Sequence, residues 1–157
     1  MKKIILIGSG GHCKSVIDVI EQEGRFKIYG LVDKPKLLGS TILGYKVIGN
    51  DKDLKRLAGK YQNALITSGQ IKSPLLRIKL FNLALQAGFK FPSIVSPKSY
   101  VSKHSTIGNG TIVMHNAVVN GNVSIGDNCI INSKALVEHD CIISSHCHIS
   151  TNATING

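Results

Sequence analysis

A six-residue repeat begins in the stretch Val95-Ser96-Pro97-Lys98-Ser99-Tyr100-Val101-Ser102-Lys103-His104-Ser105-Thr106-Ile107 and continues to residue 157. Every sixth position is Ile or Val, without a miss, at Val95, Val101, Ile107, Val113, Val119, Ile125, Ile131, Val137, Ile143, Ile149 and Ile155. Ile and Val make up about a fifth of the chain, so chance would give such a run with a probability on the order of 10⁻⁸. This repeat therefore decides the fold of the C-terminal part.

A second column of the repeat holds small residues, four positions after each aliphatic residue. It consists of Ser99, Ser105, Thr111, Ala117, Val123, Cys129, Ala135, Cys141, Cys147 and Ala153. In an α-helix a six-residue step turns about 240°, which would scatter the aliphatic side chains over three sides, so a helix is excluded. A short β-segment followed by a tight corner of Gly, Asn or Asp fits the pattern, with the β-branched residue pointing inward. The sequence thus predicts a narrow, triangular parallel β-solenoid.

Length and composition set the outer bounds of the fold. The 157 residues allow one or two small domains. No apolar run is long enough to cross a bilayer, and the N-terminus leads into a strand and not a signal peptide, so we expect a cytoplasmic protein without a membrane partner. Cys129, Cys141 and Cys147 lie in the small-residue column, so we expect buried thiols and not disulfides.

The formal net charge of +10 indicates an anionic partner. Nucleic acid, a membrane surface and phosphorylated small molecules are the candidate classes. The chain has only four Tyr and four Phe, none in a base-stacking motif, and its lysines are scattered along the sequence. These features disfavour nucleic acid.

The first ninety or so residues follow a strand, glycine loop, helix order. Lys3 to Ile7 is an apolar run, residues 8–12 are the turn Gly-Ser-Gly-Gly-His, and Ser15 to Glu23 carries apolar residues at helical spacing. Such a turn can bring the backbone close to a phosphate at the helix N-terminus. Many tight turns between a strand and a helix also use glycine without binding a ligand, so both alternatives stay open.

A second strand is predicted from Phe26 to Val32, ending at Asp33, where α/β sheets present ligand-contacting acids. Because Cys13 stands where the dinucleotide fingerprint needs its last glycine, an NAD-type site is disfavoured. Further elements are expected as an edge strand over 44–48, a helix over 51–58, a strand over 64–67 and a helix from the Ser73-Pro74 cap to Gly88. We therefore predict an α/β plus all-β protein, with a Rossmann-like domain over 1–91 and a β-helix over 92–157.

The whole chain resembles the NeuD/PglD-like family of hexapeptide-repeat acetyltransferases, which acetylate sialic acids or UDP-4-amino-sugars. The resemblance rests on residues 7–12 (Ile-Gly-Ser-Gly-Gly-His), on Val32-Asp33, on residues 135–141 (Ala-Leu-Val-Glu-His-Asp-Cys) and on residues 146–150 (His-Cys-His-Ile-Ser). It implies a left-handed parallel β-helix with three hexads per coil. It also implies a homotrimer, with acetyl-CoA bound in a groove between neighbouring solenoids and no metal.

The resemblance assigns roles to individual residues. It implies that His139 is the general base, Asp140 its orienting neighbour and His148 a residue near the acetyl group of the cofactor. The sugar or its nucleotide would bind at the N-terminal domain, through Gly8, Gly10, Gly11, His12, Asp33 and Lys34. Transfer of an acetyl group from a thioester needs a base with a near-neutral pKa, which histidine supplies, and a carboxylate partner would fix its tautomer.

The repeat also supports His139 without reference to the family. The positions one coil away on either side are Gly121 and Gly157, so an imidazole at this corner should find open space above and below it. An exposed, non-functional corner residue is the alternative for His139, and a simple surface residue is the alternative for His148. His104, His115 and His146 occupy other corners and are expected to have no catalytic role.

A zinc site is a competing interpretation of residues 139–148, because Cys and His are the ligands that zinc prefers. The phase of the repeat disfavours it, since Cys141 and Cys147 belong to the inward column while His139 and His146 belong to outward corners. Four such ligands would not converge on one ion.

Two functions remain open at this point. The first is an acetyl-CoA-dependent O- or N-acetyltransferase for a sialic-acid-like or nucleotide-linked amino sugar. From Val95 to Gly157 there are 63 residues, about three and a half coils, whereas relatives have several more coils. We therefore expect either a longer natural polypeptide or an incomplete CoA groove. In the latter case the protein would be a non-catalytic sugar-nucleotide-binding or assembly subunit, which is the second function.

Overall fold

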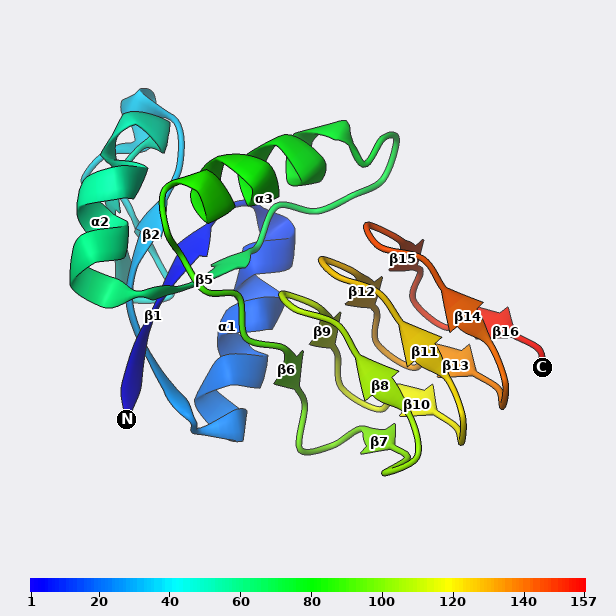
Figure 1. Cartoon of the computed structure of the whole chain (residues 1–157). Helices are drawn as coiled ribbons and strands as arrows, with labels where there is room; N and C mark the ends of the chain where they lie inside the picture. Colours follow the sequence, from blue (N-terminus) through cyan, green and yellow to red (C-terminus); the bar gives the residue numbers. More distant parts are fainter. The chain divides into compact units, whose positions relative to one another are not determined.

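The computed structural model describes all 157 residues, which form two compact units, Met1–Pro92 and Ser93–Gly157 (Figure 1). The division falls next to the Phe91-Pro92 joint expected from the sequence. We call the first part the N-terminal unit and the second the solenoid. No helix of the chain is both long and apolar enough to span a membrane.

The N-terminal unit alternates strands and helices. Its elements are β1 (Lys2–Ile7), α1 (Gly11–Glu23), β2 (Phe26–Val32), η1 (Pro35–Leu37), β3 (Thr41–Ile42), β4 (Tyr45–Gly49), η2 (Asp51–Asp53), α2 (Leu54–Tyr61), β5 (Asn63–Ile66) and α3 (Leu75–Gln86). The sheet has the order β3-β4-β2-β1-β5 and is parallel except for the pair β3 and β4. The predicted Rossmann-like unit is therefore confirmed, and the loops after β1, β2 and β5 meet at one edge of the sheet.

Two element boundaries differ from the sequence-based prediction. The 44–48 segment is not the edge strand, because Thr41–Ile42 folds back onto β4 as β3 through a turn in which Leu43 and Gly44 have φ of 47° and 85°. The first helix begins at Gly11, four residues before the expected start at Ser15. Gly10 is extended, with φ −78° and ψ −166°, and so ends the loop immediately before the helix.

Apolar residues of the strands and helices form the core of this unit. Ile5, Ile7 and Val32 pack in one cluster with side chains of α2 and α3 such as Leu57 and Phe81. Burial of this surface is the main source of stability. The core also contains a charged side chain, Arg77 of α3.

The Arg77 side chain is fully buried and ties α3 to the end of β5. Its Nη1 donates to the carbonyl oxygens of Ile66 at 2.9 Å and Ser68 at 2.7 Å. Charge-assisted hydrogen bonds of this kind hold the backbone firmly, because their loss would leave a buried charge without acceptors. Arg77 therefore fixes the position of Ser68, which matters for the site below.

The solenoid is built from two-residue strands, one in each hexad. They are β6 (Ile94–Val95), β7 (Tyr100–Val101), β8 (Thr106–Ile107), β9 (Ile112–Val113), β10 (Val118–Val119), β11 (Ser124–Ile125), β12 (Ile130–Ile131), β13 (Leu136–Val137), β14 (Ile142–Ile143), β15 (His148–Ile149) and β16 (Thr154–Ile155). They stack in three parallel sheets, with the orders β16-β13-β10-β7, β14-β11-β8 and β15-β12-β9-β6 (Figure 1).

The register of these sheets confirms the predicted coil. Val119 pairs with Val101 on one side and with Val137 on the other, so one coil takes three hexads. The aliphatic column and the small-residue column form one hydrophobic core, which includes Ala135 and Cys129. Each coil buries its apolar face only against the coils above and below it.

The corners of the solenoid follow the same six-residue period in their backbone. Left-handed residues, with φ between 53° and 67°, recur at Gly110, Asn116, Asn122, Asn128, Lys134, Asp140, His146 and Asn152. Gly, Asn and Asp tolerate this conformation better than other residues do, which explains their frequency in the corners. Asp140 therefore has a conformational reason to be an Asp, besides any chemical one.

Candidate active site

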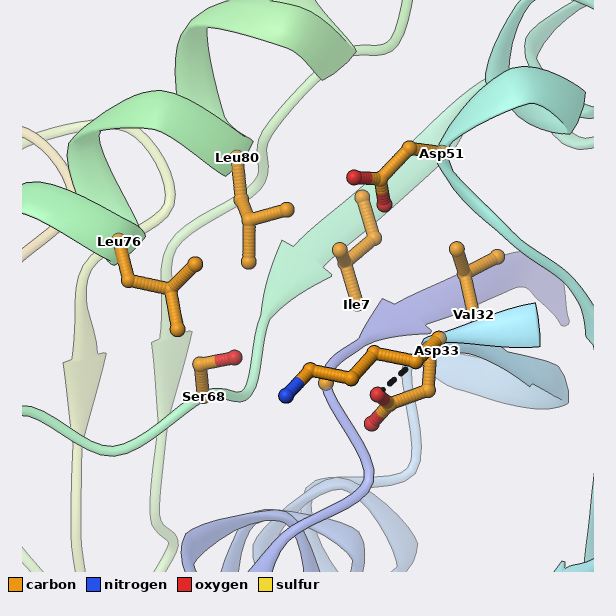
Figure 2. Close-up of a pocket in the computed structure, with 9 residues that line it drawn as sticks. Ile7, Val32, Asp33, Asp51, Ser68, Leu76 and Leu80 are labelled. Carbon is orange, nitrogen blue, oxygen red and sulfur yellow. Dashed lines mark hydrogen bonds between the residues drawn. The ribbon is translucent and has the colours of Figure 1, made fainter. Parts of the chain in front are cut away.

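The carboxyl ends of the central strands surround a hollow in the N-terminal unit. One cavity of about 100 Å³ is lined by Ile7, Gly8, Val32, Asp33, Lys34, Asp51, Ser68, Leu76 and Leu80. A second, of about 240 Å³, shares Asp33, Lys34 and Asp51 with it. Figure 2 shows Asp33, Asp51 and Ser68 around this space, with Leu76 and Leu80 of α3 on one side. We call the two cavities together the strand-end hollow.

The three glycines of the β1–α1 turn differ in the space that a side chain would find at each position. Gly8 has φ +106°, and a Cβ there would lie 2.4 Å from Ser68 Oγ and 2.6 Å from Ser68 N. Packing therefore explains Gly8 by itself. Cβ atoms at Gly10 and Gly11 would have no atom within 4 Å, so the space beside them is open.

The N-terminus of α1 follows directly from this open turn. Gly10 provides no side-chain cap, and the first turn of the helix has no acidic residue. The partial positive charge of the helix N-terminus is therefore not neutralised by side chains of α1. Such an end is suited to an anionic group.

The Asp33 carboxylate holds the glycine-rich turn in place. Its Oδ2 accepts hydrogen bonds from both the N–H and the hydroxyl of Ser9 at 2.6 Å, and its Oδ1 accepts the N–H of Lys34 at 2.7 Å. Partial burial acts to raise the pKa of Asp33, but the hydrogen bonds from Ser9 and Lys34 outweigh it and leave the pKa below its ordinary value. Asp33 is therefore ionised and already engaged in shaping the turn.

Sequence reasoning named Gly8, Asp33 and Lys34, which line the hollow, and missed Asp51 and Ser68. Gly10, Gly11 and His12 lie in the adjoining turn and first helical residues and do not line the cavity. Ser68 follows β5 and Asp51 follows β4, so the rule that ligands bind at the carboxyl ends of parallel strands could have found both.

A second polar cluster lies at a corner of the solenoid, just after β13. The Nδ1 of His139 is 2.8 Å from Oδ2 of Asp140, and Oδ1 of Asp140 accepts a hydrogen bond from Asn122 Nδ2 at 2.6 Å. The side chains of His139 and Asp140 are 69% and 62% exposed. Hydrogen bonds from Asn122 first, and from His139 second, lower the pKa of Asp140. A neutral His139 that donates Nδ1–H to this carboxylate carries its lone pair on Nε2.

The two glycines beside His139 leave space on both sides, as expected, and the imidazole occupies one of these spaces. A Cβ at Gly121 would meet only Ser102 Oγ, at 3.8 Å. A Cβ at Gly157 would lie 2.8 Å from Cε1 and 3.0 Å from Nδ1 of His139, because the imidazole itself fills that space. Gly157 is therefore the surface on which the ring rests.

His148 lies on a different sheet from the strand that precedes His139. It pairs in register with Ile130 on β12, and its Nε2 is 3.0 Å from Asn132 Nδ2. The strand before His139, β13, belongs to the sheet with β16, β10 and β7. Within one chain the two histidines thus belong to different sides of the coil.

The remaining His and Cys residues form no common site. His115 Nδ1 lies 2.6 Å from Ser96 Oγ, and His146 Nδ1 lies 3.0 Å from Asn128 Nδ2. No group of three or more His, Cys, Asp or Glu is arranged to hold a metal ion. Cys129 and Cys141 are buried free thiols, as predicted, whereas Cys147 is only half-buried. Cys13 is a buried free thiol as well.

Comparison with known families adds to this geometry. The family profile described as "PglD N-terminal domain" matches residues 3–82, about half of the chain, and "Bacterial transferase hexapeptide (six repeats)" matches residues 104–139. The chain belongs to the NeuD/PglD-like family. Its solenoid is therefore a left-handed parallel β-helix, as the resemblance implied.

Several solved structures align over 98% to 100% of the chain. The acetyltransferase domain of PglB from Neisseria gonorrhoeae FA1090 is 30% identical, with a TM-score of 0.88 over 98% of this chain and 73% of that chain. Perosamine N-acetyltransferase from Caulobacter crescentus is 30% identical, with a TM-score of 0.90 over 100% of this chain and 72% of that chain. That structure is of a histidine-to-asparagine mutant in complex with CoA and GDP-perosamine. WeeI from Acinetobacter baumannii AYE, at 23% identity and a TM-score of 0.79, shares the fold over 100% of this chain and 73% of that chain. No curated protein sequence matches the chain.

Proposed function

We propose that this chain is an acetyltransferase that moves the acetyl group of acetyl-CoA to the amine of a nucleotide-linked amino sugar. The contact between His139 Nδ1 and Asp140 Oδ2, at 2.8 Å on an exposed corner, carries the proposal. It is supported by the complex of the related perosamine N-acetyltransferase with CoA and GDP-perosamine. A hydroxyl acceptor, as in sialic acid, is the alternative acceptor chemistry.

In the proposed reaction His139 acts as the general base. The acceptor nitrogen attacks the thioester carbonyl, the new C–N bond forms and the C–S bond breaks. Nε2 of His139 takes the proton that the nitrogen loses and passes it to the leaving CoA sulfur. Asp140 keeps Nδ1–H in place and stabilises the imidazolium, as carboxylates do in related dyads.

The strand-end hollow would hold the nucleotide part of the acceptor. Hydrogen-bond donors are offered by Ser68, by Lys34 and by the open turn at Gly10 and Gly11. The free N-terminus of α1 favours a phosphate group. Asp33 and Asp51 accept hydrogen bonds and suit ribose or base groups better than phosphate. The hollow thus combines donors for phosphate with acceptors for hydroxyl or amino groups.

Acetyl-CoA supplies the activated acetyl group as a co-substrate. We propose His148, with Asn132 beside it, as a contact for the acetyl end of this molecule. Buried thiols such as Cys13 and Cys129 suit a reducing compartment, and we place the reaction in the cytoplasm.

Because His139 and His148 belong to different sides of one coil, a site that uses both needs a neighbouring chain, and we propose a homotrimer through the solenoid. The outward positions of β7, β10 and β13 are Tyr100, which is 58% exposed, and the half-buried Val118 and Leu136. This apolar row would be covered by the next protomer. Sedimentation at tens of micromolar should give a trimer, and a purely monomeric protein would contradict the proposal.

The function is tested by incubating the protein with acetyl-CoA and a panel of acceptors, with the products read by mass spectrometry. The panel contains UDP- and GDP-linked amino sugars, CMP-sialic acid and free nonulosonic acids. A mass increase of one acetyl group on a nucleotide amino sugar is expected. Binding of such a sugar without any transfer would instead favour the non-catalytic binding subunit.

Asn122 should position the catalytic pair without touching the substrate. The Asn122→Gly variant keeps the left-handed corner, with φ +60°, and removes the hydrogen bond to Asp140. We expect kcat to fall about 3- to 10-fold with KM unchanged, because the carboxylate loses one of its two anchors. The pKa of Asp140, followed by NMR of the carboxyl carbon, should rise towards its ordinary value.

Asn152→Gly is the matched control for this prediction. Asn152 occupies the same position of its hexad, at another corner of the solenoid, with φ +61°, and its side chain makes no hydrogen bond. Equal losses of kcat in the two variants would mean that Asn122 acts only through the general stability of the corners.

A further inference from the structure

The positive charge of the protein is confined to one of its two units. The N-terminal unit contains sixteen Lys and Arg residues against six Asp and Glu, whereas the solenoid contains three of each. The full formal charge of +10 therefore belongs to Met1–Pro92. The proposed acceptor site accounts for little of it, because the two cavities of the strand-end hollow are lined by two lysines, Lys34 and Lys52, and by two acids, Asp33 and Asp51.

A larger cavity lies at the opposite edge of the same sheet. It has a volume of about 310 Å³ and is lined by Lys2, Lys3, Lys60, Tyr61, Gln62, Asn63 and Lys90. Lys2, Lys3 and Asn63 begin the parallel strands β1 and β5, so this cavity opens at the amino ends of the strands, away from the strand-end hollow. We call it the lysine pocket. No acidic residue lines it.

Two of the lysines converge on one pair of aromatic rings. The rings of Tyr29 and Tyr61 lie 4.2 Å apart between centroids. Lys3 Nζ is 5.1 Å from the Tyr29 centroid and 5.9 Å from the Tyr61 centroid, and Lys60 Nζ is 5.9 Å and 5.4 Å from the same two centroids. Cation–π attraction thus holds both ammonium groups at the same place, although they repel each other.

The clustered charges have no protein partner that neutralises them. None of the four lysines of the pocket takes part in an ion pair. The carboxyl end of α2, at Tyr61, offers about half a negative charge, which favours Lys60 but leaves most of the four positive charges uncompensated. Like charges held together in a concave site are typical of a site for an anion.

We infer that the lysine pocket binds a phosphate-bearing ligand with at least two negative charges, at a site separate from the acceptor site. The four ammonium groups suit phosphate oxygens as flexible point-charge donors, and the side-chain amides of Gln62 and Asn63 add neutral donors. The volume is close to the lower end of the range for small-ligand pockets. A free oligophosphate and the phosphate headgroup of a lipid share this chemistry.

The test is calorimetry of the full chain with inorganic pyrophosphate, at low and at physiological salt. Removing two converging charges in the Lys3→Gln/Lys60→Gln variant should weaken binding at least about tenfold. The Lys46→Gln/Lys55→Gln variant is the matched control, because it loses the same charge from exposed lysines outside the pocket and should keep the wild-type affinity within about twofold. Equal weakening in both variants would reduce the effect to net charge and overturn the inference.

Two further arms separate the possible sources and sites. Amide chemical-shift changes should be centred on residues 2–3, 60–63 and 90. If pyrophosphate shifts only the turn around Gly10, it binds at the proposed acceptor site and the lysine pocket is not an anion site.

Vesicles with phosphatidic acid, sedimented with the protein, distinguish a lipid headgroup from a free phosphate. Capture that depends on Lys3 and Lys60 supports the pocket with a lipid source, and the absence of binding to both probes overturns it. Acetyl transfer by the Lys3→Gln/Lys60→Gln variant is measured separately, so failure of the pocket and failure of the proposed function are distinguishable.

Discussion

Replacing His139 with Ala should lower kcat by roughly 10²–10⁴, the usual range for the loss of a general base. KM for both substrates and the stability of the fold should stay close to wild type, because the side chain is 69% exposed and leaves no cavity in the core. Only Asp140 holds the ring by a hydrogen bond. Steady-state kinetics with the acceptor identified by mass spectrometry, together with thermal unfolding, measures both effects.

Two further substitutions serve as a control and as a milder variant for His139→Ala. His104→Ala removes another exposed corner histidine, one without a carboxylate partner, and should leave kcat unchanged. Asp140→Asn keeps a residue that tolerates φ +62° and should cost less than His139→Ala, since it disturbs only the tautomer and charge of the imidazole. A His139→Ala enzyme that retains most of its activity would remove this histidine from the mechanism.

The solenoid could be predicted from sequence almost completely, because every hexad must meet the same three structural requirements. Val137 must point inward, Ala135 must be small enough to pack in the narrow core, and Asp140 must adopt a left-handed corner. These three requirements recur every six residues, so errors at one position are corrected by the others. The central strand β1 was predictable because Ile4 to Ile7 form a continuous buried apolar run, as is typical of parallel strands. In β2 the buried residues alternate with exposed ones over its first half and then end in Leu31 and Val32, which is a strand pattern as well.

The parts that sequence did not predict depend on contacts between distant residues. Asn122 meets Asp140 only because the coil brings positions eighteen residues apart into register. The repeat predicted bare glycines on both sides of His139, but it does not encode that the imidazole lies against Gly157 and not against Gly121. Ser68 joins the strand-end hollow because buried Arg77 holds its carbonyl oxygen. The two-residue strand β3 lies outside any repeat, so it leaves no periodic signal, unlike the equally short strands of the solenoid.

The glycine-rich turn gives the other large expected effect. Gly10→Val places a branched side chain in the open space beside the N-terminus of α1, where no protein atom lies within 4 Å of the added Cβ. The extended backbone of Gly10 accepts valine, so the fold should lose no more than about 1 kcal/mol from the poorer N-cap. If the phosphate of the acceptor approaches this turn, its affinity should fall about 10²-fold, while acetyl-CoA binding stays unchanged.

Gly59→Val is the matched control for Gly10→Val, because a Cβ at Gly59 also meets no atom within 4 Å, but in α2 and outside the hollow. Calorimetry with the nucleotide sugar and with acetyl-CoA should show loss of the first ligand only, and only in the Gly10 variant. Loss of acetyl-CoA binding with the acceptor retained would mean that the two sites are assigned the wrong way round. Retention of both ligands would leave Gly10 as a helix cap. In that case Asp33, whose carboxylate already accepts three hydrogen bonds from Ser9 and Lys34, would serve only to shape the turn.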